Sequence, residues 1–145
     1  MTSYVTAVNV QATAQRVWDV LTDAPAYAEW NPEIVAIAGR MALDEKIKAR
    51  VKIGSGAIRT VSMRVTAFDA PWRMQWTGGL PLGLFVGVRT FTVTPRTDGA
   101  EFRMHLEMRG PLAPMILKSV GNRQPEIDTF AAAIRARAEA FSPNP

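Results

Sequence analysis

The stretch ATAQRVWDVLTDAPAYAEWNPEI (residues 12–34) changes from a helical to an extended pattern along its length. Thr13 is a suitable helix N-cap, and the apolar residues after it recur at helical spacing. Pro25 interrupts this helix, and the Asn31-Pro32 pair ends a second one. The stretch therefore predicts two short helices followed by a strand. The buried stripe expected for the first helix is Val17, Trp18, Val20 and Leu21.

Trp30 lies just before the expected end of the second helix. Connections usually run over the surface, whereas a large indole is usually buried. We therefore expect Trp30 to pack between the short helices and the strands, with ligand contact as its second possible role.

Alternating apolar and polar residues around this stretch indicate an antiparallel sheet of about seven strands, wet on one face. The cleanest alternation, EFRMHLEMR (101–109), places Phe102, Met104, Leu106 and Met108 inward. The expected strands cover residues 3–10, 33–38, 44–53, 57–68, 72–77, 84–95 and 101–109.

The Asp98-Gly99 pair predicts a tight hairpin turn. A two-residue turn there pairs Phe91 with Leu106 and Arg89 with Met108. Arg89 is thereby predicted on the apolar face of the sheet, provided that no bulge intervenes.

A second expected turn, at Ala70-Pro71, pairs Ala67 with Met74 and Val65 with Trp76. The same alternation places Trp72 on the apolar face beside Met74 and Trp76.

The chain ends in an amphipathic helix that begins near residue 112. Pro125 either kinks this helix or splits it in two. Its expected buried stripe is Ile127, Phe130, Ile134, Ala138 and Phe141.

The bulk composition predicts a single domain over residues 1–145. The chain has no cysteine, which excludes disulfides and cysteine nucleophiles. It shows neither a signal-peptide pattern nor an apolar run of the roughly 20 residues that a membrane span needs. We therefore expect a cytoplasmic protein.

The net charge of +4 is concentrated in part on one strand face, which carries Lys46, Lys48, Arg50 and Lys52. Nucleic-acid binding would need exposed aromatics among these cations, and here the aromatics face the other way. We predict a solvated face, no nucleic-acid partner and at most transient contact with a membrane surface. The oligomeric state is left open.

Methionines and aromatics share the inward face with Arg89. Such a lining suits either a packed core or a pocket for apolar ligands, and the lining alone does not separate the two.

The order of strand, two short helices, antiparallel strands and long helix resembles the helix-grip fold of the START-like, or Bet v 1-like, superfamily. More narrowly, the chain is similar to the SRPBCC polyketide cyclase/dehydrase and lipid-transport families. Besides residues 12–34, the resemblance is carried by WTGGLPLGLFVGVRTFTVTP (76–95) and FAAAIRARAEAF (130–141). It implies an α+β fold with a curved sheet around the C-terminal helix and a deep hydrophobic cavity between them.

Few residues suggest chemistry. His105, the single histidine, falls on the outward face, and no acidic residue falls clearly on an inward strand face. We therefore assign no catalytic residue, metal or cofactor. The glycine- and leucine-rich residues 78–87 form an apolar flap at a cavity mouth, a contact with a membrane or partner, or an ordinary connection between strands.

The favoured hypothesis is binding or transport of a hydrophobic or amphipathic small molecule, lipid-like or polyketide-like. Arg89 would orient a polar head. The alternatives are a polyketide cyclase or dehydratase that uses the same cavity, and a cochaperone-like protein-interaction module. The predicted ligand-binding residues are Arg89, Trp76, Met74, Met63, Phe91, Met104, Leu106, Met108 and Trp30.

Overall fold

The computed structural model describes residues 1–52 and 56–140. Its elements are β1 (Thr2–Val10), α1 (Ala14–Thr22), η1 (Ala24–Ala26), α2 (Tyr27–Trp30), β2 (Ile34–Ala38), β3 (Lys46–Lys52), β4 (Ile58–Asp69), β5 (Arg73–Leu80), η2 (Pro81–Gly83), β6 (Phe85–Arg96), β7 (Gly99–Arg109), α3 (Ala113–Val120) and α4 (Gln124–Ala140). None of the helices in this part of the chain is long and apolar enough to cross a membrane.

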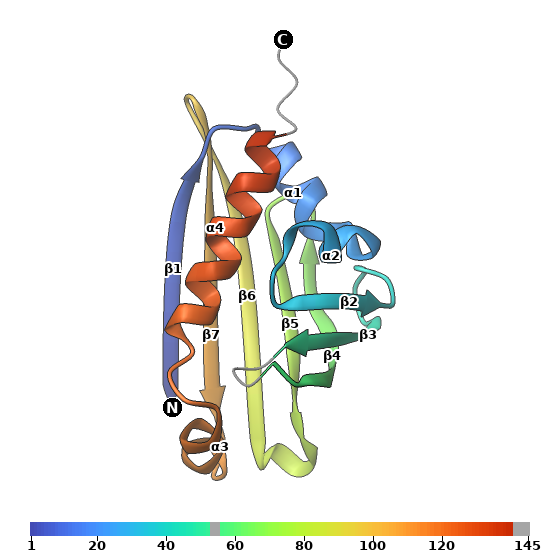
Figure 1. Cartoon of the computed structure of the whole chain (residues 1–145), viewed down its shortest axis with the longest axis vertical. Coiled ribbons are helices and arrows are strands. Elements are labelled where there is room, and N and C mark those ends of the chain that lie inside the picture. The colour runs from blue at the N-terminus through green and yellow to red at the C-terminus, as the bar shows by residue number, and fades with distance from the viewer. Residues whose placement is uncertain (53–55, 141–145) are drawn as a thin grey trace.

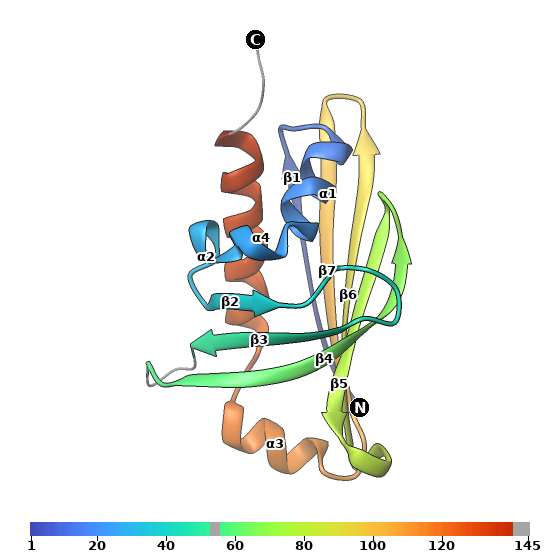
Figure 2. The same cartoon turned by 90° about the vertical axis from the view of Figure 1, so that its right-hand side faces the viewer.

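The strands form one antiparallel sheet in the order β1-β7-β6-β5-β4-β3-β2. Helix α4 lies lengthwise against its β1–β7 side (Figure 1). The sheet bends so strongly that β2 and β3 run crosswise to β6 and β7 (Figure 2). The predicted α+β helix-grip fold is therefore confirmed.

The stretch that leads into β2 is built by local polar contacts. Thr13 caps α1, its hydroxyl accepting from the Arg16 N–H at 3.1 Å. The buried Asn31 accepts from the backbone N–H groups of Glu33 and Ile34, both at 2.9 Å. This side chain turns the chain from helix into strand. The predicted stripe Val17, Trp18, Val20 and Leu21 is buried.

The predicted β6–β7 register is wrong by two residues. The turn is Thr97-Asp98, so Phe91 pairs with Met104 and Arg89 with Leu106. Gly99 belongs to β7, where an added Cβ would lie 2.2 Å from the Val10 carbonyl oxygen. The glycine is therefore required by the close approach of β1 rather than by the turn. Because side chains alternate with a period of two, this shift leaves Arg89 on the inward face.

The β4–β5 register holds in part. Val65 pairs with Trp76 as predicted, but a bulge follows, so that Ala67 lies opposite Gln75 and Met74 opposite Phe68. The extra residue of the bulge interrupts the simple alternation. Trp72 lies in the turn before β5 and is 48% exposed, so its predicted inward placement is wrong.

The expected C-terminal helix is split. Gly121, with φ of 79°, follows α3, and Pro125 lies in the first turn of α4, where its missing N–H removes no intrahelical bond. The predicted stripe of α4 is buried at Ile127, Phe130, Ile134 and Ala138. Phe141, the last residue of that predicted stripe, lies outside the described residues, as does residue 53 at the end of the expected strand 44–53.

Candidate ligand pocket

A pocket of about 480 Å³ opens between the sheet and the segment that contains α3 and the start of α4. Its apolar wall includes Met63 and Trp76 from the sheet and Ile116 and Val120 from α3. This volume falls within the usual range of about 300–1,000 Å³ for small-molecule sites.

Glycines give the pocket part of its room. Gly78 in β5 and Gly87 in β6 are directly paired, and both line the pocket. A Cβ on Gly78 would lie 2.8 Å from the Ser62 carbonyl oxygen, so this position is closed to larger residues. Most of the glycine- and leucine-rich residues 78–87 belong to the ends of β5 and β6. Only Pro81–Gly83 forms the connecting turn between these strands.

The predicted ligand-binding residues divide into two groups. Met63, Trp76, Arg89, Leu106 and Met108 line the pocket. Met74, Phe91 and Met104 are buried but are not part of its wall.

Phe130 of α4 accounts for this division. Its ring lies 5.5 Å from that of Phe91 and stacks at 6.1 Å on Phe102, centroid to centroid. Aromatic contacts at these distances fill the space that the alternating pattern left open. The inward face of the sheet is thus packed core where Phe130 of α4 covers it, and it lines the pocket toward α3.

Trp30 lies outside this pocket. Its ring centroid is 4.7 Å from that of Tyr27 and 5.5 Å from that of Phe130, the latter edge-on. It also lines a smaller hollow of about 300 Å³ beside Asp19 and Arg137. Its contact with Phe130 joins α2 to α4, so Trp30 packs against the long helix where packing against the strands was predicted.

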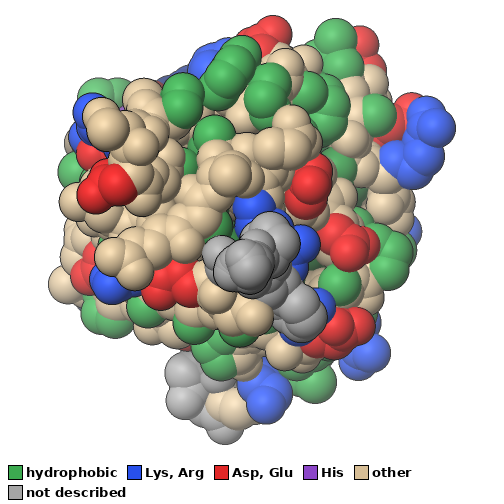
Figure 3. Space-filling view, turned by 90° about the horizontal axis from the view of Figure 1, so that it is seen from above, with side chains coloured by type: hydrophobic (Ala, Val, Ile, Leu, Met, Phe, Trp, Pro, Cys, Tyr) green, Lys and Arg blue, Asp and Glu red, His purple; other side chains and the backbone are tan. Residues whose placement is uncertain are grey.

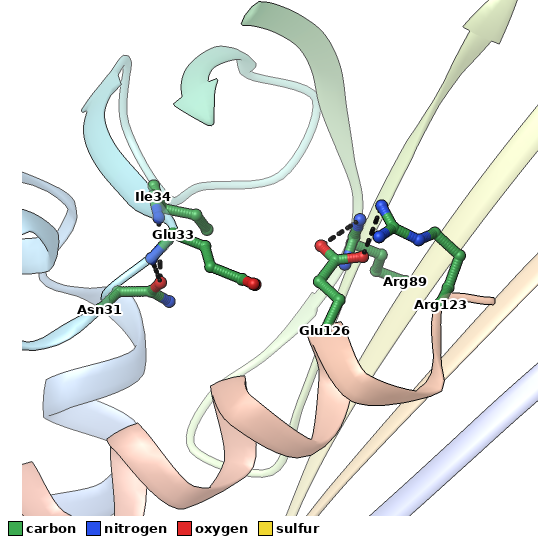
Figure 4. Close-up of polar contacts among 6 residues, drawn as sticks. All are labelled: Asn31, Glu33, Ile34, Arg89, Arg123 and Glu126. Atoms are coloured by element: carbon green, nitrogen blue, oxygen red, sulfur yellow. Dashed lines mark hydrogen bonds and ion pairs between the residues drawn. The ribbon is translucent and has the colours of Figure 1, made fainter. Parts of the chain in front are cut away.

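Charged side chains gather at one part of the pocket wall. Arg89 Nη2 lies 2.9 Å from Glu126 Oε2, and Arg123 Nη1 lies 3.6 Å from Glu126 Oε1 (Figure 4). The three side chains are only 23%, 13% and 28% exposed for Arg89, Glu126 and Arg123, respectively. Glu126 thus neutralises part of the cationic charge that the sequence assigned to Arg89 alone.

Glu126 was not predicted, because the alternating pattern identifies inward residues on strands and Glu126 belongs to a helix. It comes from the first turn of α4, where a carboxylate is favoured by the helix dipole. Its spacing of four residues from the buried Phe130 was the available signal, since residues four apart lie on the same face of a helix.

Glu33, just before β2, points its carboxyl toward Glu126 (Figure 4). Burial raises the pKa of Glu33, and the negative charge of Glu126 raises it further, while Arg123 and Arg89 lower it. Two carboxyls and two guanidiniums therefore share this part of the molecule. It can both donate hydrogen bonds to a ligand oxygen and accept them from a ligand hydroxyl.

Along β7, His105 alternates with the buried residues Met104 and Leu106. It does not line the pocket. Within residues 1–52 and 56–140, no three Asp, Glu or His side chains are grouped as a metal site would need.

The model of the family described as polyketide cyclase/dehydrase and lipid transport matches residues 1–139. Among curated protein sequences none matches the chain.

Solved structures of the same fold include a protein from Mesorhizobium loti, with 17% identity and a TM-score of 0.75 over 98% of this chain and 100% of the other. A START superfamily protein from Mycobacterium smegmatis is 20% identical, with a TM-score of 0.73 over 97% and 99%. The Zhui aromatase/cyclase from a Streptomyces strain is 16% identical, with a TM-score of 0.73 over 98% and 99%. At these identities the likeness shows the fold alone.

Proposed function

The chain belongs to the polyketide cyclase/dehydrase and lipid-transport family, and from this membership we propose that it binds a hydrophobic or amphipathic small molecule in the pocket beside α3. The observation that supports an amphipathic ligand is the continuity of an apolar wall with one charged cluster. Met63, Met108 and Ile116 line the same pocket as Arg89 and Glu126.

Burial of the apolar part of the ligand supplies the affinity. Each 100 Å² of apolar surface removed from water contributes about 2.5 kcal/mol, before the cost of immobilising the ligand is subtracted. The unbranched methionine side chains at Met63 and Met108 adapt to ligands of different shape.

The polar part of the ligand is placed at the Arg89–Glu126 pair. A carboxylate or carbonyl oxygen would accept from a guanidinium N–H of Arg89 or Arg123, and a hydroxyl would donate to Glu126. Because Glu126 already pairs with both arginines, the cluster suits a head group with one negative charge or none better than one with several.

The test is ligand binding by the purified full chain. Native mass spectrometry of freshly purified protein is expected to show a co-purified small molecule. After extraction with organic solvent and refolding, a dansyl-labelled fatty acid is expected to bind saturably, one molecule per chain, and to be displaced by unlabelled fatty acid or by a polycyclic ketone. A protein that carries no ligand and takes up neither competitor would contradict the proposal.

A cyclase-type enzyme is the second candidate, and Glu126 beside Arg89 is the observation that favours it. In an intramolecular aldol step, an enolate carbon of a poly-β-ketone attacks a ketone carbon, and one C–C bond forms. The carboxylate of Glu33, whose pKa is raised, would first take a proton from the α-carbon and so form the enolate. Arg89 would polarise the ketone carbonyl, whose π bond opens to an alkoxide, and Glu33 would return the proton to that alkoxide.

This second candidate is tested with a poly-β-ketone thioester mimic. Enzymatic cyclisation that Arg89→Met and Glu33→Gln each abolish supports it, provided that circular dichroism shows both variants folded. If the cyclised product forms no faster with the protein than without it, the result contradicts the cyclase hypothesis and leaves ligand binding as the function. The third hypothesis, a cochaperone-like module, stays a prediction from the fold.

A further inference from the structure

One end of the molecule presents apolar side chains to solvent. The exposed fractions are 44% for Leu80, 96% for Leu82, 40% for Leu84 and 60% for Met115. Leu80 ends β5, Leu82 lies in η2, and Leu84 precedes β6. Met115 belongs to α3. We call these four residues the apolar tip. Both segments lie at the same end of the molecule in Figure 2.

Leu82 is the most exposed member, and its backbone is unusual. Its φ of 60° and ψ of 24° lie in the left-handed region, which is unfavourable for a residue with a Cβ. The conformation places an apolar side chain in water, where it gains no burial energy within the chain. Folding alone therefore gives no reason for a leucine at this position.

The tip is held in a fixed arrangement. The backbone N–H of Leu112, just before α3, donates to the Leu84 carbonyl oxygen at 2.9 Å. Gly110, with φ of 103°, lets the chain pass so closely that a Cβ would lie 2.7 Å from the same oxygen. The η2 turn and the start of α3 are therefore joined through their backbones.

The two segments that carry the apolar tip contain no acidic residue. Residues 70–97 and 108–125 contain no Asp or Glu. Lys118 is exposed on α3, and Arg59 is exposed where β4 lines the pocket. Arg109 is paired with Glu107 at 3.0 Å and adds no net charge. The opposite end of the molecule, by contrast, shows acidic and basic side chains intermixed (Figure 3).

The tip is continuous with the pocket. Leu80 itself lines the pocket, together with Phe85, which follows Leu84, and Ile116, which follows Met115. A surface that covers the tip would therefore adjoin the pocket.

We propose that the apolar tip docks on an anionic lipid bilayer, with Leu82 and Met115 inserted among the lipids and Lys118 near the head groups. Cations beside exposed apolar side chains match the chemistry of such a surface. A second copy of the chain is a poorer occupant, because a symmetric contact would bring Lys118 against its own counterpart. The proposal does not depend on which ligand the pocket holds.

Vesicle co-sedimentation with the full chain tests this proposal. The wild type is expected to bind vesicles of phosphatidylcholine and phosphatidylglycerol at least about tenfold more tightly than vesicles of phosphatidylcholine alone, and to lose this preference at high salt. Leu82→Asp and Met115→Asp, combined, are expected to weaken binding at least about tenfold, and Lys118→Glu severalfold.

Leu43→Asp is the matched control, because Leu43 is 55% exposed in the connection between β2 and β3. It is expected to bind vesicles as the wild type does, and circular dichroism is expected to show all variants folded. Absence of binding to the anionic vesicles would overturn the proposal, as would equal binding by Leu82→Asp/Met115→Asp. A dimer in sedimentation velocity that this double variant dissociates would likewise overturn it, in favour of a contact between copies.

Discussion

Arg89 of β6 and Glu126 of α4 form an ion pair, 2.9 Å from Nη2 to Oε2, that joins the centre of the sheet to the first turn of the long helix. The pair has two consequences. It fixes the start of α4 against the sheet, and it sets charged groups beside a pocket whose wall is mostly apolar.

Arg89→Met is expected to lower the free energy of unfolding by about 1–2 kcal/mol, because it removes the closer partner of a largely buried carboxylate. Arg123, at 3.6 Å, limits the loss. Urea unfolding measures the change. In the double variant Arg89→Met/Glu126→Gln much of the stability is expected to return. Equal losses in the single and double variants would show that the arginine acts through packing and not through the pair.

Glu33→Gln is expected to alter the pH dependence of stability. Since the pKa of Glu33 is raised by burial, then by Glu126, ionisation is harder in the folded chain than in the unfolded one. Below the ordinary pKa of glutamate the Glu33 carboxyl is neutral in both the folded and the unfolded chain, so its ionisation does not lower the stability. As the pH rises from about 4 to 7, the wild type loses stability relative to Glu33→Gln. A difference between the two proteins that is constant over this range would contradict the raised pKa.

Trp30→Ala is expected to destabilise the chain by about 2–4 kcal/mol, because it removes the ring contact with Phe130 that joins α2 to α4 and the contact with Tyr27 within α2. Trp72→Ala serves as the control. Trp72 is 48% exposed, and its loss is expected to cost less than about 1 kcal/mol. Thermal and urea unfolding measure the stability of both variants. Similar losses of stability in Trp30→Ala and Trp72→Ala would show that the ring contacts of Trp30 contribute no more than an exposed tryptophan does.

The sequence predicted the sheet and helices well because their patterns are local. Alternation over residues 101–109 indicated the inward face, and it survived a two-residue error in register because alternation has a period of two. The turn around Asn31 was readable for the same reason, since its contacts span only a few residues.

The division between core and pocket could not be read locally. Phe91 and Met108 both occupy inward positions of the alternating pattern. Phe130 packs on Phe91, whereas Met108 lines the pocket. That difference depends on how α4 crosses the sheet, a contact between distant residues. Glu126 was missed for the same reason, and Trp72 because the strand begins one residue after it.

The central claim, that a small molecule occupies this pocket, is tested most directly at Gly87. A Cβ there would make only ordinary contacts with the Phe85 ring, at 3.7 Å and beyond, so that a larger side chain enters the pocket without backbone strain. The measurement is equilibrium binding of the dansyl-labelled fatty acid to wild type, Gly87→Ala and Gly87→Leu. The account predicts near-wild-type affinity for Gly87→Ala and a loss of at least about tenfold for Gly87→Leu, with both proteins folded. Unchanged affinity in a folded Gly87→Leu protein would show that the ligand binds elsewhere.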